Sequence, residues 1–169
     1  IDLVLNHTSA EHPWFTTAYS YVESLGEGEE IDTDVCPEAE YYNFSRQQSG
    51  GFYPVGDSGW YYEAQFWSEM PDLNLMNQAV RDEIEDIIDF WLDRGVDGFR
   101  LDATTYYVSG GTDSNIEILS WINDTVKASN PDAYIVGEAW TDQSTYAQYY
   151  QSGVDSFFNF RFAGKDGVI

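Results

Sequence analysis

The sequence is poor in basic residues and almost free of cysteine. Its 169 residues include seven Lys and Arg against thirty Asp and Glu, which gives a formal net charge of −23. Such a surface offers no basic patch for nucleic acid, so we expect no nucleic-acid partner. No apolar run reaches the roughly 18 residues of a membrane helix, so we expect no membrane span. The single Cys36 cannot form an internal disulfide.

Aromatic residues are abundant, at 17% of the chain, and hydrophobic residues reach 43%. This composition is that of a globular protein whose length suits one domain. Aromatic rings either fill a core or stack on sugar rings, and composition alone leaves both readings open. The chain opens in the apolar stretch Ile1–Leu5 without an initiator Met or a signal-like segment. We therefore expect an internal piece of a longer protein.

Residues 8–69 show no helical periodicity and are rich in Gly, Ser, Tyr, Asp and Glu. A segment this long without regular structure indicates a functional loop or a small inserted subdomain. The pieces Tyr41–Phe44 and Trp60–Phe66 are expected to be short strands inside it.

Two helices are predicted in the second half of the chain. The first lies between a capping Asn77 and a terminating Gly95, with an apolar stripe formed by Val80, Ile84, Ile87, Ile88, Trp91 and Leu92. The second ends at Asn130-Pro131, with an apolar face formed by Ile118, Leu119, Ile122 and Val126. A shorter helical stretch is expected over 143–151.

Apolar strands alternate with these helices, over 96–101, 133–137 and 154–158. This alternation predicts a parallel sheet with functional side chains at the carboxyl ends of its strands. A doubly wound open sheet would show the same alternation, although the sequence lacks its Gly-rich phosphate loop.

Two of these strands end in a carboxylate, Asp102 and Glu138, and Arg100 lies two residues before the first acid. Cleavage of a glycosidic bond with retention needs a nucleophile and a proton donor about 5–5.5 Å apart. Successive strand ends are suited to present such a pair. The alternative is a structural ion pair between Arg100 and Asp102, and the pair by itself does not decide between them.

Four ordered segments add a family resemblance: Asp2–His7, Met70–Asn74, Gly98–Asp102 and Gly137–Trp140. In these segments the chain resembles the α-amylase family, glycoside hydrolase family 13. The resemblance implies an α/β fold, namely a partial TIM (β/α)8 barrel from strand 3 to strand 6 with an inserted, irregular or β-rich domain B. It assigns 1–7 to strand 3, 8–69 to domain B and 70–169 to the rest of the barrel.

The resemblance also assigns the catalytic residues. Asp102 would be the nucleophile and Glu138 the general acid and later base, with Arg100 keeping Asp102 ionised. An arginine beside a carboxylate lowers its pKa, and partial burial is expected to raise the pKa of Glu138. The family's third carboxylate would lie beyond Ile169, so we expect this piece alone to be inactive.

Substrate contacts are implied for three further residues. His7 would hydrogen-bond the sugar in the cleavage subsite, and Trp140 would stack on the next glucose unit. Tyr106 would stack or hydrogen-bond, because Thr105 and Tyr106 occupy the positions where amylases often carry Lys-His.

Catalysis in such a site requires no cofactor, and no metal ligand is expected among the catalytic residues. The resemblance leaves room for a calcium ion near Asn6 and Asn74. Asn74 stands where typical members have an aspartate, which removes a charged oxygen ligand from a site for a hard cation.

The resulting prediction is a retaining α-glucan hydrolase that cleaves α-1,4-glucosidic bonds of starch or malto-oligosaccharides through a covalent glucosyl-enzyme. Ala103, directly after the nucleophile, resembles α-1,4-acting members. The alternatives are an α-glucosidase or transglycosylase on short oligosaccharides, or a non-catalytic amylase-like subunit. A polymer substrate and an acidic surface favour an extracellular location.

Overall fold

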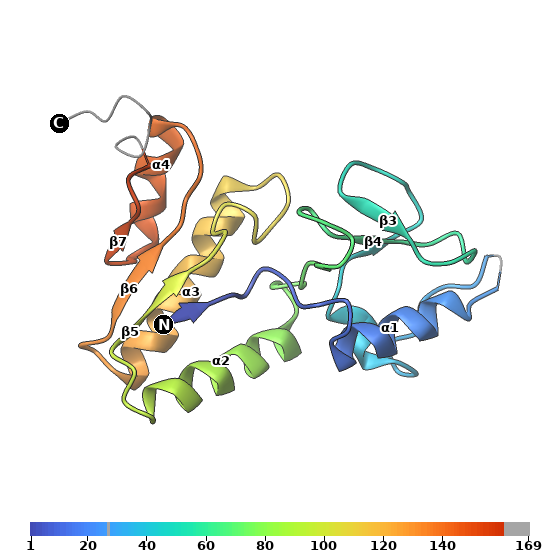
Figure 1. Ribbon diagram of the computed structural model, residues 1–169, viewed down its shortest axis with the longest axis horizontal. Helices are drawn as coiled ribbons and strands as arrows, with labels where there is room; N and C mark the ends of the chain where they lie inside the picture. Colours follow the sequence, from blue (N-terminus) through green and yellow to red (C-terminus); the bar gives the residue numbers. More distant parts are fainter. Residues whose placement is uncertain (27, 161–169) are drawn as a thin grey trace. The chain divides into compact units, whose positions relative to one another are not determined.

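The computed structural model describes residues 1–26 and 28–160. The chain divides into two compact units (Figure 1). Unit 1 consists of Ile1–Leu5 and Glu83–Ile169, and unit 2 consists of Asn6–Asp82. The finer boundaries expected from the sequence, at 7/8 and 69/70, stay predictions.

Unit 1 contains a parallel sheet in the order β1-β5-β6-β7. Its strands are β1 (Asp2–Leu3), β5 (Gly98–Leu101), β6 (Tyr134–Gly137) and β7 (Ser156–Phe157). In the described part of the chain this sheet is open at both edges rather than closed into a barrel. Because all four strands run in the same direction, their carboxyl ends lie along one edge of the sheet (Figure 1).

Close contact between β5 and β6 depends on a glycine. A Cβ added at Gly98 would lie 1.9 Å from the carbonyl oxygen of Tyr134, which no side chain tolerates. Gly98 therefore lets the two backbones approach and sets the register in which Arg100 lies opposite Val136.

The helices follow the predicted alternation: α2 (Gln78–Leu92), α3 (Thr112–Ser129), α4 (Gln143–Tyr149) and the short 3-10 helix η2 (Tyr150–Ser152). Asn77 caps α2, since its side-chain oxygen accepts the Val80 N–H at 3.1 Å. Gly95 adopts a φ of 83°, the left-handed conformation that ends many helices. Both predicted signals are confirmed.

The buried face of α3 is the predicted one, formed by Ile118, Leu119, Ile122 and Val126. The stripe of α2 is narrower than predicted. Ile84 and Ile88 are buried, whereas Trp91 is 38% exposed and packs edge-on against Phe90 at 5.2 Å. The prediction that Trp91 belongs to the core is wrong for the described residues.

Unit 2 contains an antiparallel sheet in the order β2-β4-β3. Its elements are α1 (Pro13–Glu23), the 3-10 helix η1 (Pro37–Glu40), β2 (Phe44–Ser45), β3 (Phe52–Pro54) and β4 (Tyr61–Glu63). Helix α1 corrects the prediction that residues 8–69 lack helical periodicity. Its buried residues Phe15, Ala18 and Val22 have helical spacing, but the Thr, Ser and Tyr residues between them have low helix propensity.

Aromatic side chains fill the core of unit 2. Phe15 packs against Tyr42 and Tyr62, with ring centroids 5.1 and 4.9 Å apart in edge-to-face geometry. Such pairs add stability beyond the area they bury. Much of the aromatic content of this unit therefore serves packing.

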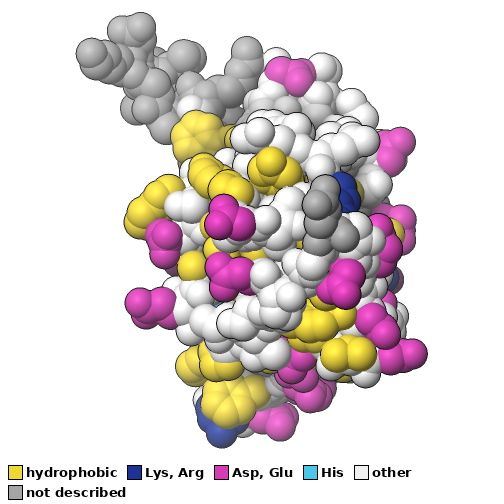
Figure 2. Space-filling view, turned by 90° about the vertical axis from the view of Figure 1, so that its right-hand side faces the viewer, with side chains coloured by type: hydrophobic (Ala, Val, Ile, Leu, Met, Phe, Trp, Pro, Cys, Tyr) yellow, Lys and Arg dark blue, Asp and Glu magenta, His cyan; other side chains and the backbone are white. Residues whose placement is uncertain are grey.

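Acidic side chains are scattered over the face shown in Figure 2, where basic side chains are rare. Among the described residues, no helix is both long and apolar enough to cross a membrane.

Candidate active site

One arginine joins the two strand-end acids of unit 1. Nη1 of Arg100 lies 2.6 Å from Oδ1 of Asp102, and Nη2 lies 2.9 Å from Oε2 of Glu138. A third acid, Asp2 on β1, lies 3.7 Å from Nη1. Because one guanidinium binds both Asp102 and Glu138, the two carboxyls face the same space at the carboxyl edge of the sheet. The structure thus brings together three residues that the sequence singled out.

The backbone after β5 is tied to the end of β6. Thr104 donates to the carbonyl oxygen of Glu138 twice, through its backbone N–H at 3.1 Å and its hydroxyl at 2.8 Å. Ala103 N–H points at Oε2 of Glu138, at 3.4 Å. To make this turn Ala103 adopts a φ of 51°, a left-handed conformation that costs a non-glycine residue about 1–3 kcal/mol. Such strain is typical of functional sites.

The two acids differ in how many donors they receive. Burial raises the pKa of Asp102, and interaction with the Glu138 carboxyl adds to this effect, so that together they outweigh the lowering by Arg100. Burial also opposes ionisation of Glu138, but N–H donation by Trp140 and Ala103, helped by Arg100, brings the pKa of Glu138 below its usual value. The surroundings therefore shift the pKa values of the two acids in opposite directions.

These directions are the reverse of the ones expected from the sequence, which had a low pKa at Asp102 and a raised pKa at Glu138. The reason is that Arg100 does not serve Asp102 alone. It binds both acids, and Glu138 receives two further N–H donors. Hydrogen bonds to the ionised form lower the pKa of an acid, whereas a neighbouring carboxyl raises it.

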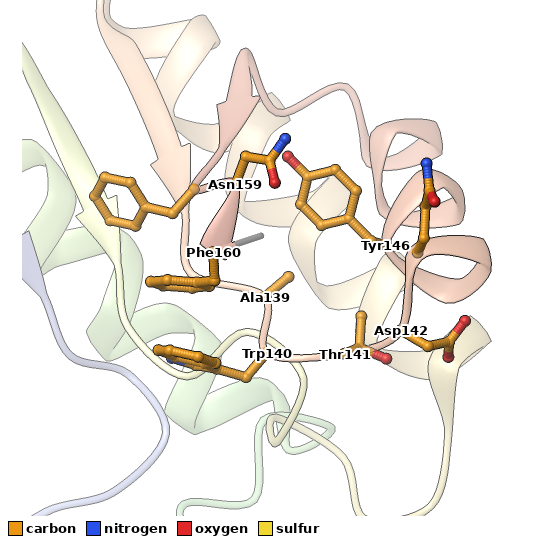
Figure 3. A pocket seen from close by; sticks show the side chains of 9 residues that line it. Ala139, Trp140, Thr141, Asp142, Tyr146, Asn159 and Phe160 are labelled. Carbon is orange, nitrogen blue, oxygen red and sulfur yellow. The ribbon is translucent and has the colours of Figure 1, made fainter. Parts of the chain in front are cut away.

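Trp140 contacts the acid and lines a cavity beside it. Its indole N–H donates to Oε1 of Glu138 at 3.1 Å. Its ring stacks on Phe160, with centroids 3.6 Å apart and planes 10° from parallel (Figure 3). Both rings, with Tyr146 and Phe158, line a cavity of about 490 Å³ at the ends of β6 and β7.

Tyr106 lies at the other side of Trp140. Both residues line a second cavity of about 280 Å³, together with Thr105, Thr141 and Tyr149. Tyr106 is 37% exposed, so part of its ring is open to a ligand. Two of the three predicted substrate-binding residues therefore share one cavity next to the acid pair.

The third, His7, belongs to unit 2. Within unit 2 its backbone pairs with Asp72, and its ring packs edge-on against Phe66 at 5.8 Å. A sugar contact by His7 stays a prediction.

Asn6 and Asp72 form a buried polar pair inside unit 2. Asn6 is 1% exposed and Asp72 is 2% exposed. The side-chain N–H of Asn6 donates to Oδ1 of Asp72 at 3.0 Å, while the backbone and side chain of Gln65 donate to Oδ2 at 3.1 and 2.8 Å. Burial nevertheless raises the pKa of Asp72 from 3.8 to about 6.

The expected calcium ligands do not assemble at Asn74. Its side chain donates to the carbonyl oxygen of Glu40 and accepts the Met76 N–H, at 3.2 Å each. The partner of Asn6 is Asp72 instead, and that carboxylate already receives three N–H donors. Among the described residues no cluster of three or more His, Cys, Asp or Glu side chains is arranged to hold a metal. A calcium ion near Asn6 and Asn74 stays a prediction.

Sequence reasoning missed three features of the site. They are the left-handed conformation of Ala103, the hydrogen bond from the Trp140 indole to Glu138, and the stacking of Phe160 on Trp140. The first two depend on atoms brought together by folding. A signal for the third existed, since Phe158 and Phe160 follow the last strand as Glu138 and Trp140 follow β6.

Known proteins are similar to this chain in sequence and in structure. The sequence model of the family described as "Alpha amylase, catalytic domain" matches residues 1–166. Alpha-amylase 3 of Dictyoglomus thermophilum is 39% identical over 168 residues, which cover 98% of this chain and 31% of the relative. An alpha-glucosidase of Apis mellifera is 28% identical over 198 residues, covering 96% and 34%.

Among solved structures, Amy13B of Eubacterium rectale superposes with a TM-score of 0.93 at 51% identity, covering 99% of this chain and 32% of that one. The chain thus spans about a third of the length of these relatives.

Proposed function

Because the chain belongs to the alpha-amylase family of glycoside hydrolases, we propose that it supplies the nucleophile and the acid/base of a retaining hydrolase acting on α-1,4-linked glucans. The parallel sheet of unit 1 is part of the TIM barrel of that family's catalytic domain. The observation that carries the proposal is the bridge from Arg100 to both Asp102 and Glu138.

In the first step Asp102 attacks the anomeric carbon of the bound glucose unit. The bond between that carbon and the glycosidic oxygen breaks, and Glu138 gives its proton to the departing oxygen. The leaving sugar departs as a neutral alcohol, and the glucosyl unit stays on Asp102 as an ester.

In the second step Glu138, now a carboxylate, takes a proton from water. The resulting nucleophile attacks the anomeric carbon, releases Asp102 and gives a product with retained configuration. Catalysis in this family needs no cofactor.

In this sequence of steps Glu138 must carry a proton while Asp102 is ionised. The surroundings raise the pKa of Asp102 and lower that of Glu138, which opposes this arrangement. The shared Arg100 compensates the charge of whichever acid is ionised.

The test is Asp102→Asn in the full natural protein that carries this sequence. We expect turnover of maltoheptaose to fall by about three orders of magnitude or more, because the amide is not a nucleophile, while binding of the oligosaccharide persists. The measurements are steady-state kinetics and calorimetric binding. Activity within tenfold of wild type would refute the assignment.

A second candidate is an α-glucosidase or a transglycosylase on short oligosaccharides, which the likeness to the Apis mellifera alpha-glucosidase favours. The two readings share the same acids and differ in products. Chromatography of early products from maltoheptaose separates them: maltose and longer fragments indicate internal cleavage, whereas glucose alone indicates the glucosidase.

A further inference from the structure

The two oxygens of the Glu138 carboxyl have different partners. Oε2 faces the cationic Nη2 of Arg100 at 2.9 Å and the N–H of Ala103 at 3.4 Å. A proton on Oε2 would point at groups that are themselves donors. Oε1 accepts only the indole N–H of Trp140 among the described hydrogen bonds, so it has room for a proton in its other lone-pair direction.

Trp140 is held in place at an edge and at a face. Its N–H edge is fixed by the bond to Glu138, and one face is covered by the parallel ring of Phe160. Figure 3 shows the two rings layered beside the cavity. The side chain is still 56% exposed, so this orientation comes from two specific contacts and not from burial.

We propose that Trp140 is a positioning residue for Glu138: its indole N–H fixes Oε1 as the proton-bearing oxygen, and Phe160 clamps the indole that does so. This inference rests on the proposed function, since it assigns a partner to the acid of that reaction.

The clamp acts on proton donation. When the glycosidic bond breaks, the proton on Oε1 passes to the departing oxygen and Glu138 becomes a carboxylate. The N–H of Trp140 bonds that new charge more strongly than the neutral acid, which favours the transfer. A leaving group that departs as an anion, such as fluoride, takes no proton and gains nothing from the clamp.

The charged groups of unit 1 around Glu138 are Arg100 and Asp102 on and after β5, with Asp2 on β1 reaching Arg100. Against this background the Trp140 bond lowers the pKa of Glu138. Its removal therefore moves the alkaline limb of the pH–rate profile to higher pH, because that limb reports loss of the acid's proton.

The experiment uses Trp140→Phe in the full natural protein. Phenylalanine keeps an aromatic ring to stack on Phe160 and removes the N–H together with part of the indole. Two substrates are compared by kcat/KM, which reports the steps through bond cleavage: maltoheptaose, whose leaving group needs a proton, and α-maltosyl fluoride, whose leaving group does not.

Trp121→Phe is the matched control. Trp121 makes the same kind of bond, from its indole N–H to Oε1 of Glu85 at 3.0 Å, between α3 and α2. Its loss should leave the ratio of the two kcat/KM values unchanged.

For Trp140→Phe we expect a loss of about tenfold or more on maltoheptaose, less than about twofold on the fluoride, and an upward shift of the alkaline limb. An equal loss on both substrates, or no loss and no shift, would overturn the proposal.

Should Trp140→Phe fail to fold, Phe160→Leu decides. It keeps the N–H and loosens the clamp, and we expect the same selective loss on maltoheptaose at smaller size, against an equal loss on both substrates if the proposal is wrong. A wild-type protein inactive on both substrates would instead contradict the proposed function itself.

Discussion

Two sites of this molecule hold partly or fully buried carboxylates, and they compensate the cost of burial with different partners. In unit 1, Asp102 and Glu138 share the charge of Arg100 and remain partly open, with side-chain exposures of 24% and 17%. In unit 2, Asp72 is 2% exposed and receives only amide N–H donors, from Asn6 and Gln65. No Lys or Arg of the described chain forms an ion pair with Asp72.

The difference shows that the pKa of a buried acid depends on the number of its donors as well as on a cation. The amide donors of Asp72 do not offset its burial, and its pKa stays raised, at about 6. The N–H groups of Trp140 and Ala103, helped by Arg100, offset the burial of Glu138, whereas Arg100 does not offset the burial of Asp102. Asp72 joins backbone segments inside unit 2, whereas Asp102 and Glu138 stay partly exposed.

The largest expected effect comes from replacing the guanidinium that binds both acids. In Arg100 one nitrogen binds Asp102 and another binds Glu138. Arg100→Lys leaves a single ammonium nitrogen, which cannot reproduce this planar arrangement. We expect kcat/KM on maltoheptaose to fall by about 10²–10³, equivalent to roughly 3–4 kcal/mol.

Arg94→Lys is the control, since Arg94 contacts only the Phe90 ring and carbonyl among the described interactions. It should keep wild-type activity. If kcat/KM of Arg100→Lys stayed within tenfold of wild type, the shared cation would not be what distinguishes the site in unit 1 from that in unit 2.

The next largest effect should be a loss of stability when a second negative charge is placed beside Asp72. Asn6→Asp replaces a donor to Asp72 by a second carboxylate, and we expect unit 2 to lose about 2–3 kcal/mol at pH 7.5. At pH 4.5 the two acids share a proton, so the loss should be smaller.

Hydrogen exchange at the Leu73 and Gln65 amides, measured with a chelator present, reports this region by itself. Asn130→Asp in unit 1 controls for added charge, because its side-chain oxygen only accepts the Asp132 N–H. Equal destabilisation at both pH values would contradict the expectation.

The smallest expected effect is a gain in stability. The pKa of Asp72 is higher in the folded state than in the unfolded state. The contribution of Asp72 to stability is therefore complete below about pH 4 and is lost as pH rises through about 6. Asp72→Asn removes this loss. The side-chain oxygen of Asn6, buried without a partner, can then accept the new amide N–H after a flip.

We therefore expect Asp72→Asn to stabilise the region by about 1–3 kcal/mol at pH 7.5 and to change it little at pH 4.5. The same amide exchange measurement checks this. If Asp72→Asn were less stable than wild type by equal amounts at both pH values, the ionised carboxylate of Asp72 would not be what destabilises the fold at pH 7.5.

Sequence patterns were sufficient where one element carries the signal. The stripe of α3, the cap at Asn77, the stop at Gly95 and the acids after two apolar strands all follow from local spacing. Such patterns need no knowledge of distant residues, and they already indicated where the acid pair lies.

The remainder depends on tertiary contacts. Helix α1 forms because Phe15 packs among Tyr42 and Tyr62, residues far along the chain, and not because of its own propensity. The lowered pKa of Glu138 depends on Trp140 and Ala103, whose N–H directions no pattern reveals. The exposure of Trp91 and the partner of Asn6 were missed for the same reason.

The two hydrogen bonds from Thr104 to the carbonyl oxygen of Glu138 have a consequence for redesign of this site. These bonds tie the segment after Asp102 to the end of β6, so a change that shifts one strand end carries the other with it. Attempts to tune the spacing of the two acids should therefore begin at Thr104, a residue that takes no part in the chemistry.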